Sequence, residues 1–302
     1  MPVDEMRIGA LREIGFLGVG LMGSPMVRHL LGAGFRVRAW NRTPGKLDPL
    51  VGAGAIRAAT PAEAADGADV LCLCVTDKTA VEDVLFGPGG AARAARVPAI
   101  AVDFSTIGPT ATLALAGRLR DECGTSWVDA PVSGGATGAE QRRLVIMCGG
   151  EADVIARLEP LFGAFSQRVT RVGALGSGQT LKLCNQLIVA TNLVAISEAF
   201  TLARASGLDL DTIPQALAGG FADSIPLQIF GRRMAQGVHS PVLGELALML
   251  KDLDAVRDLA EERGPVLPMT LAALEVYHRA AKRGLIHQDL SALFKLYIEE
   301  LR

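Results

Sequence analysis

The chain has 302 residues, half of them hydrophobic, and a formal net charge of −2 at neutral pH. This length favours two domains, and the composition is that of a soluble globular protein. A near-neutral chain offers no basic field to nucleic acid, and no apolar run of 18 residues predicts a membrane span. The start of the chain carries Asp4 and Glu5 and soon reaches a glycine-rich loop, which argues against a signal peptide. We therefore expect a cytoplasmic protein that needs neither a membrane nor a nucleic acid.

The spacing of cysteines and histidines predicts neither disulfides nor a metal site. Cys72 and Cys74 alternate along an apolar run at 70–75, so both thiols share a face of a predicted buried strand and pack as small hydrophobic groups. The other cysteines are scattered, and the histidines show no ligand spacing with cysteines or carboxylates. We expect reduced thiols and no metal; the remaining residues concerned are Cys123, Cys148, Cys184, His29, His239, His278 and His287.

The first motif is a glycine-rich loop between a predicted strand and a predicted helix. Residues 13–18 have the pattern of a short strand, residues 24–33 that of a helix, and residues 35–40 that of a second strand. The loop reads G-x-G-x-x-G, which in this context makes a tight turn and directs a helix N-terminus at the pyrophosphate of a dinucleotide. The predicted contacts are Gly18, Val19, Gly20, Leu21, Met22 and Gly23.

The residues after the second strand indicate which dinucleotide is bound. An acidic residue there would hydrogen-bond the ribose 2′-hydroxyl of NAD, but the chain has Asn41, Arg42 and Thr43. No carboxylate repels a 2′-phosphate at this place, and an arginine pairs with one. We therefore favour NADP, with NAD as the alternative if Arg42 is only a surface residue.

Alternating strand and helix signals continue to Gly173. Further strands are predicted at 70–75, 100–103, 126–129, 144–148 and 168–172, and helices begin near Pro61, Lys78 and Pro109. This alternation predicts an α/β fold with a doubly wound, mainly parallel sheet of the Rossmann type. Ligands of such sheets bind beyond the carboxyl ends of the strands, where this chain carries Val75, Thr76, Asp77, Thr106 and Ser133.

Ser133 is followed by two glycines. Successive backbone N–H groups beside a serine hydroxyl can bind an anion such as a carboxylate. An ordinary glycine turn is the alternative, and it is the commoner use of such a segment. The segment by itself leaves both interpretations open.

The longest helix signal covers residues 177–206. After Gly178 neither glycine nor proline interrupts the helical spacing of its apolar residues until Gly207. Lys182 and Asn185 lie three residues apart near its start and therefore share a face. A lone lysine on such a helix is either a functional group or a residue whose amine reaches solvent, and the spacing does not separate the two.

No strand is predicted after Gly207. Helical runs predict an all-α domain, so we expect a dinucleotide-binding domain over 1–175 and an all-helical domain over 176–302, which begins with the long helix. Lys251 and Asp252 follow an apolar run, where spacing alone favours a surface ion pair. The helical runs lie at 209–217, 226–236, 243–263, 268–283 and 289–301.

Four segments together resemble the β-hydroxyacid dehydrogenase family, which includes 3-hydroxyisobutyrate dehydrogenase, tartronate semialdehyde reductase and the glyoxylate/succinic semialdehyde reductases. They occur in the family's order and spacing over nearly the whole chain, which is more specific than any single glycine loop. The resemblance implies an NAD(P)-dependent oxidoreductase. The segments are GFLGVGLMGSPM (15–26), DAPVSGG (129–135), GALGSGQTLKLCNQ (173–186) and LKDLD (250–254).

The resemblance also implies roles for individual residues. Lys182 would be the catalytic acid/base, because reduction of a carbonyl by hydride leaves an alkoxide that needs a proton, which a lysine supplies and an arginine does not. The substrate carboxylate would be bound by Ser133, Gly134 and Gly135, with Asn185 orienting the substrate. The cofactor would be contacted by the glycine loop, Asn41, Arg42, Thr43, Thr106 and Lys251.

Two segments that bear on the choice of substrate differ from the pattern of many family members. Gly244 stands seven residues before Lys251, where many relatives carry a phenylalanine, and residues 219–225 are closer to the tartronate semialdehyde reductase type than to 3-hydroxyisobutyrate dehydrogenase. We therefore expect an NADP-dependent reductase of short aldehydo or oxo acids such as tartronate semialdehyde, glyoxylate or succinic semialdehyde.

Other functions remain as alternatives. One is an NAD(P)-dependent dehydrogenase of β-hydroxy amino acids or 3-hydroxyisobutyrate, and another is a non-catalytic NADP-binding scaffold. Lys182 argues against the scaffold and against an imine reductase, which usually replaces this lysine. The helices rich in alanine and leucine in the second half predict a homodimer or homotetramer.

Overall fold

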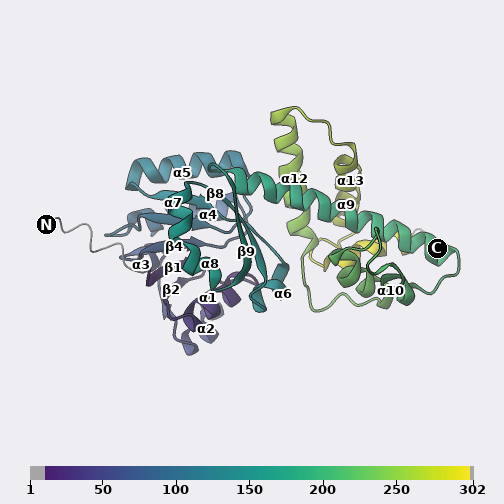
Figure 1. The fold of residues 1–302 in the computed structure, drawn as a ribbon, viewed down its shortest axis with the longest axis horizontal. Coiled ribbons are helices and arrows are strands. Elements are labelled where there is room, and N and C mark those ends of the chain that lie inside the picture. The colour runs from purple at the N-terminus through teal and green to yellow at the C-terminus, as the bar shows by residue number, and fades with distance from the viewer. Residues whose placement is uncertain (1–10, 300–302) are drawn as a thin grey trace. The chain divides into compact units, whose positions relative to one another are not determined.

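The fold is described by a computed structural model, in which residues 11–299 are placed well enough to describe. The chain forms two compact units, Met1–Lys182 and Leu183–Arg302 (Figure 1). The first unit contains a sheet covered by helices and the second is helical, which confirms the predicted fold class. The division between the units falls within the long helix, and the domain limits of 1–175 and 176–302 stay a prediction.

A twisted sheet forms the centre of the first unit. Its neighbours run in the order β3-β2-β1-β4-β5-β6-β8-β7, with β9 paired to β8, and the six strands from β3 to β6 in this order are parallel. Strand β8 is antiparallel to β6 and β7. The strands are β1 (Glu13–Leu17), β2 (Arg36–Trp40), β3 (Ile56–Arg57), β4 (Val70–Leu73), β5 (Ile100–Asp103), β6 (Ser126–Asp129), β7 (Val132–Ser133), β8 (Leu144–Gly149) and β9 (Ser166–Gly173).

Helices bury both faces of this sheet. Successive side chains of a strand point to opposite faces, so Phe16 of β1 joins one apolar core and Leu17 joins the other. Every residue of β4 and β5 is buried, as expected for parallel strands covered on both sides. One core includes α1 (Gly23–Gly32), α7 (Ala152–Arg157) and α8 (Glu159–Gly163), and the other includes α3 (Pro61–Ala65), α4 (Lys78–Phe86) and α5 (Pro109–Cys123).

Two helix starts follow the predicted signals. The Asp77 carboxylate accepts the amide N–H of Ala80 at 2.9 Å and so caps α4, which begins at Lys78 as predicted. At α3, Thr60 Oγ1 accepts the Glu63 amide N–H at 3.1 Å, while the Glu63 carboxylate accepts the amide N–H of Ala59 at 2.7 Å. These three hydrogen bonds fix the residues at which α3 and α4 begin.

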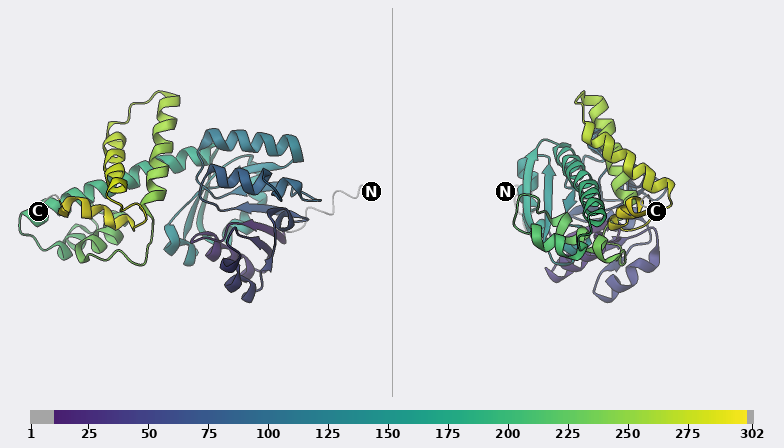
Figure 2. Two further views of the ribbon diagram at one scale, coloured as in Figure 1. Left: turned by 180° about the vertical axis from the view of Figure 1, so that it is seen from behind. Right: turned by 90° about the vertical axis from the view of Figure 1, so that its right-hand side faces the viewer.

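The second unit consists of helices around its own apolar core. Helix α9 (Ser177–Ala205) begins in the first unit and continues into the second, where Leu193 and Phe200 are buried. Helices α12 and α13 pack side by side (Figure 2). The other α-helices of this unit within residues 11–299 are α10 (Ile213–Leu217), α11 (Arg232–Gln236), α12 (Leu246–Arg263), α13 (Pro268–Lys282) and α14 (Lys295–Glu299).

Four of the helices predicted in the second unit differ from those observed. The run predicted at 209–217 starts with a 3₁₀ turn, Leu210–Thr212. The helix predicted from 243 begins only at Leu246, because the buried Asp289 carboxylate accepts the Leu243 amide N–H at 2.7 Å and holds this segment out of the helix. The run predicted at 226–236 starts with a π-helical turn, and the run at 289–301 starts with a 3₁₀ turn, Leu290–Phe294. The last residues of that run lie outside the described residues.

Helix α9 is long and apolar enough to cross a membrane by length and composition alone. That test is also passed by core helices of soluble proteins, and α9 contributes Ala190, Leu193, Ile196 and Phe200 to the core of the second unit. Length and composition therefore do not distinguish a membrane-spanning helix from a core helix here.

Candidate active site

The glycine loop has the shape needed to approach a dinucleotide. A side chain at Gly18, whose φ is +98°, would run into the carbonyl oxygen of Cys74, and one at Gly23 would run into the carbonyl oxygen of Gly18. Gly18 therefore lets the loop pack against the chain that follows β4, and Gly23 lets the loop close against its own backbone. A Cβ at Gly20 would have no heavy atom within 4 Å, so space lies in front of this residue, beside the start of α1. The loop thus fits a pyrophosphate at a helix N-terminus.

The end of β2 is tied to this loop through Asn41. Its Oδ1 accepts the Val19 amide N–H at 3.0 Å, and its Nδ2 donates to the Thr43 carbonyl oxygen at 3.0 Å. Asn41 therefore has a structural task that the sequence did not reveal. Arg42 is exposed, and among residues 11–299 no hydrogen bond or ion pair occupies its guanidinium. That group is available for a phosphate.

The ends of β4 and β5 lie side by side at the carboxyl edge of the sheet. The Val75 amide N–H donates to Ser105 Oγ at 3.0 Å, and Ser105 precedes the half-buried Thr106. The Thr76 hydroxyl donates to the Asp77 carboxylate at 2.8 Å, so Asp77 serves the loop and the α4 cap together. The first unit thus brings these predicted cofactor residues to one edge.

The predicted carboxylate-binding segment follows β7. Gly134 and Gly135 have φ values of +128° and +61°, which favour glycine, and both are exposed. Ser133 is half-buried. Helix α6 (Gly135–Glu140) is linked to α1, because Arg28 donates to both carboxylate oxygens of Glu140 at 2.5 and 2.6 Å. The segment that carries Ser133 is therefore fixed to the helix behind the glycine loop.

Helix α9 starts at the same edge because a buried carboxylate holds its first turn. Asp129 closes β6 and accepts the amide N–H groups of Gly176 at 2.7 Å and Gln179 at 2.8 Å. Burial raises the pKa of Asp129, and the backbone hydrogen bonds oppose that shift. The sequence predicted Asp129 only as the end of a strand and gave no sign of these hydrogen bonds, because the partners lie about fifty residues away in the chain.

Lys182 lies three residues after Gln179 and is only 8% exposed, so the surface interpretation of this lysine is wrong.

The second unit joins two further predicted residues by a chain of polar contacts. Asn185 donates from Nδ2 to the Gln186 amide oxygen at 2.8 Å, and Gln186 donates from Nε2 to the Asp252 carboxylate at 2.6 Å. The Lys251 ammonium lies 3.1 Å from the other oxygen of Asp252. Asp252 is 5% exposed, so the expectation of a surface ion pair is wrong for the carboxylate. Only the structure connects Gln186 and Asp252 to these two predicted residues.

Gly244, which stands where many relatives carry a phenylalanine, has Leu290 as a close neighbour. A Cβ there would meet the side chain of Leu290 at 2.9 Å, and the Leu290 amide N–H donates to the Gly244 carbonyl oxygen at 2.8 Å. A larger residue at this position requires Leu290 to move. The glycine is thus part of the packing between the start of α12 and the 3₁₀ turn at Leu290–Phe294.

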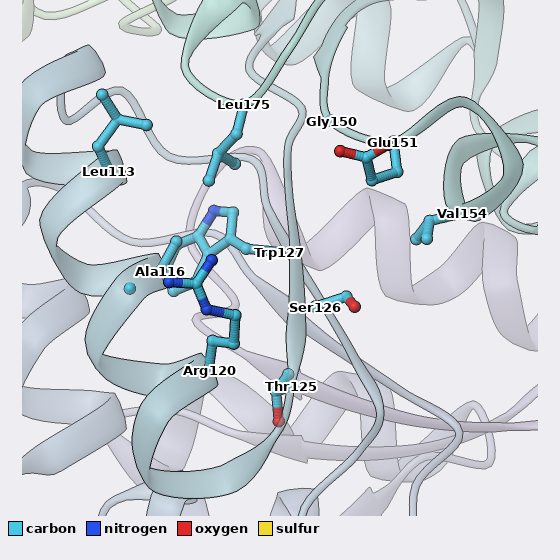
Figure 3. A pocket seen from close by; sticks show the side chains of 11 residues that line it. Leu113, Ala116, Arg120, Thr125, Ser126, Trp127, Gly150, Glu151, Val154 and Leu175 are labelled. Carbon is cyan, nitrogen blue, oxygen red and sulfur yellow. The ribbon is translucent and has the colours of Figure 1, made fainter.

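A pocket of about 340 Å³ lies elsewhere in the first unit (Figure 3). Its wall comes from α5, the start of β6 and α7, and none of the predicted site residues lines it. Thr125, Ser126 and Trp127 place it at the amino end of β6, whereas ligands of parallel sheets bind at the carboxyl ends. This pocket therefore lies away from the edge at which the sheet topology predicts a ligand.

The cysteines are all free. Burial raises the pKa of the Cys74 thiol to about 12, with the Asp103 charge as a smaller cause, so this thiol stays protonated. Among the described residues, no group of three or more histidines, cysteines or carboxylates is arranged to hold a metal ion.

Two family models match successive parts of the chain. Residues 13–173 match the family model described as the NAD binding domain of 6-phosphogluconate dehydrogenase. Residues 176–297 match the model described as NAD-binding of NADP-dependent 3-hydroxyisobutyrate dehydrogenase.

Individual relatives cover almost the whole chain. The 2-hydroxy-3-oxopropionate reductase of Escherichia coli is 38% identical over 281 residues, which are 93% of this chain and 95% of the relative. The structure of 3-hydroxyisobutyrate dehydrogenase from Salmonella typhimurium aligns with a TM-score of 0.87 at 28% identity, over 94% of this chain and 99% of that one. The structure of Psf3 in complex with NADP+ and 2-OPP aligns with a TM-score of 0.85, also at 28% identity and over the same shares.

Proposed function

Since the chain belongs to the β-hydroxyacid dehydrogenase family and is an NAD(P)-dependent oxidoreductase, we propose that it reduces a short aldehydo or oxo acid with NADPH. The substrate is of the tartronate semialdehyde, glyoxylate or succinic semialdehyde type, and the reaction runs in reverse as oxidation of a β-hydroxyacid. The similarity to the E. coli 2-hydroxy-3-oxopropionate reductase, another name for tartronate semialdehyde reductase, supports this choice.

The observation that carries the proposal is the buried lysine at the start of α9. Asp129 anchors the first turn of this helix at the carboxyl edge of the sheet, and Lys182 follows three residues after Gln179. A lysine that is mostly removed from water and lies near a dinucleotide-binding edge has the properties of a general acid/base. A binding scaffold would gain nothing from burying an ammonium group, which is costly.

The preference for NADPH rests on Arg42. Its guanidinium is exposed at the end of β2, next to the Asn41 side chain that fixes the glycine loop. A charge-assisted pair with the 2′-phosphate would stabilise NADPH relative to NADH by about 1.5–3 kcal/mol.

In the proposed mechanism each residue has one task. The nicotinamide of a dinucleotide held at the glycine loop would supply the hydride. Ser133 and the N–H groups of Gly134 and Gly135 bind the substrate carboxylate, and Asn185 orients the substrate. Lys182 donates a proton to the carbonyl oxygen, on which negative charge develops as hydride reaches the carbon. Lys251 is the further cofactor contact that we propose, and the Asp252 carboxylate, 3.1 Å away within the same unit, holds its ammonium group.

We further propose a cytoplasmic homodimer or homotetramer that acts on a small carboxylate and not on nucleic acid or at a membrane. The free cysteines support a reducing compartment.

A screen for oxidation of NADPH tests the proposed function. The purified protein would be assayed with tartronate semialdehyde, glyoxylate and succinic semialdehyde, and glyoxylamide would serve as a control that lacks the carboxylate. We expect turnover with at least one acid and a large loss with the amide. Assays in reverse with serine and 3-hydroxyisobutyrate cover the alternative dehydrogenases. Absence of turnover with every acid, together with retained NADPH binding, would favour the scaffold.

A further inference from the structure

The Gln179 side chain connects α9 to the loop that follows β5. Its Nε2 donates to the Ser105 carbonyl oxygen at 2.7 Å, and its Oε1 accepts the amide N–H groups of Ile107 at 3.0 Å and Gly108 at 3.1 Å. The residue is fully buried. One side-chain amide therefore satisfies three backbone groups of a loop that lies about seventy residues away in the chain.

The same side chain and its backbone join three strand ends. Ser105 also accepts the Val75 amide N–H, so the end of β4 is held through it. The Gln179 amide N–H donates to the Asp129 carboxylate at the end of β6. The ends of β4, β5 and β6 are thus tied to one turn of α9, and all these contacts lie within the first unit.

We propose that Gln179 is a positioning residue, which fixes the loop bearing Thr106 relative to Lys182. Thr106 lies between the two groups that Gln179 holds, the Ser105 carbonyl and the Ile107 amide. Lys182 follows Gln179 by three residues on the same face of α9. This inference rests on the proposed function, because it assigns Gln179 the task of aligning the cofactor loop with the proton donor. Misplacement of reacting groups by about 1 Å costs up to roughly a hundredfold in rate.

The three hydrogen bonds of Gln179 need one donor and one acceptor, and a glutamate at this position would offer both only when it is protonated. A neutral carboxyl group has one O–H donor and one acceptor oxygen, so it reproduces all three hydrogen bonds. An ionised carboxylate has no donor and faces the Ser105 carbonyl oxygen. Burial disfavours the ionised form, so a carboxyl group here ionises well above its ordinary pKa.

The test compares Gln179→Glu and Gln179→Met with the wild type. Gln179→Glu should keep most of the wild-type kcat at low pH and lose about tenfold to a hundredfold relative to the wild type as pH rises through the ionisation of the introduced carboxyl group. Gln179→Met removes all three bonds and should lose kcat at every pH. The Kd for NADPH should change much less than kcat, because the glycine loop that would hold the pyrophosphate is untouched.

A second measurement does not depend on turnover. Amide hydrogen exchange at Ile107 and Gly108 should accelerate in Gln179→Met, and in Gln179→Glu only at high pH. If the ratio of kcat for Gln179→Glu to that of the wild type stays constant with pH, or if exchange at both amides is unchanged, the inference is overturned. A wild type that reduces none of the acids would instead refute the proposed function, while the exchange measurement still tests the anchor.

Discussion

The proposed preference for NADPH depends on Arg42. Its guanidinium is exposed beside the glycine loop, where an acidic residue would otherwise meet the ribose of NAD. Arg42→Asp should remove the pair with the 2′-phosphate and repel it, so kcat/KM with NADPH should fall by one to two orders of magnitude relative to NADH, about 1.5–3 kcal/mol. Steady-state kinetics with both cofactors measure this. A wild type that uses NADH as efficiently as NADPH would refute the assignment.

Gly18 and Gly20 are expected to have different roles: Gly18 is needed for the fold, and Gly20 leaves room for the cofactor. Gly20 faces open space, so Gly20→Ala should leave thermal stability nearly unchanged and raise the Kd for NADPH by at least about tenfold, since the methyl group enters the space of the pyrophosphate. Gly18→Ala is the matched control and should lower the melting temperature, because its methyl group meets the Cys74 carbonyl. Equal NADPH affinity for Gly20→Ala and the wild type would place the cofactor elsewhere.

At the scale of elements, the sequence predicted most of the first unit. Strands and helices with strong period-2 or period-3.6 patterns were predicted close to their observed ends, and the long helix predicted at 177–206 is observed at Ser177–Ala205. Two-residue strands such as β3 and β7 were missed because they are too short to show a pattern. The pairing of Gln179 with the loop after β5, and of Gln186 with Asp252, joins positions far apart in the chain. No local pattern contains that information.

His239, in the segment before α12, should make the stability of the folded chain depend on pH. His239 Nδ1 lies 2.8 Å from the hydroxyl of the buried Ser291. Burial lowers the pKa of His239, and the positive charges of Lys295 and Arg233 lower it further. The negative charge of Asp289 acts in the opposite direction, but the net shift is downward. The folded state therefore favours the neutral ring, so stability from this group is present above its ordinary pKa of 6.5 and is lost as pH falls through the lowered value.

Urea unfolding at about pH 7.5 and about pH 5.5 measures this effect. The wild type should lose stability at the lower pH, and His239→Gln should show a smaller loss. His278→Gln, which changes a side chain that is 40% exposed, should retain the wild-type dependence. Identical pH dependence in His239→Gln and the wild type would show that the ring does not titrate in this window.

At the scale of the whole molecule, the proposed oligomer has a candidate surface in the second unit. Ile188 and Leu202 of α9 are 64% and 70% exposed and lie two heptads apart, so they fall on one side of the helix. Replacing both with Asp should convert the assembly to monomers, measured by light scattering after size-exclusion chromatography. Val266→Asp, at an exposed position between α12 and α13, is the control. A double variant with wild-type mass would exclude this face.

The most direct test of the proposed enzyme is the turnover of Lys182→Met. Methionine keeps the helix propensity and most of the volume but has no proton to donate, so kcat should fall by about 10²–10⁴-fold while NADPH affinity stays near wild type. Lys282→Met, which changes an exposed lysine at the end of α13, should keep full activity. Wild-type turnover in folded Lys182→Met, with the best acid found, would contradict the assignment of Lys182 as the acid/base.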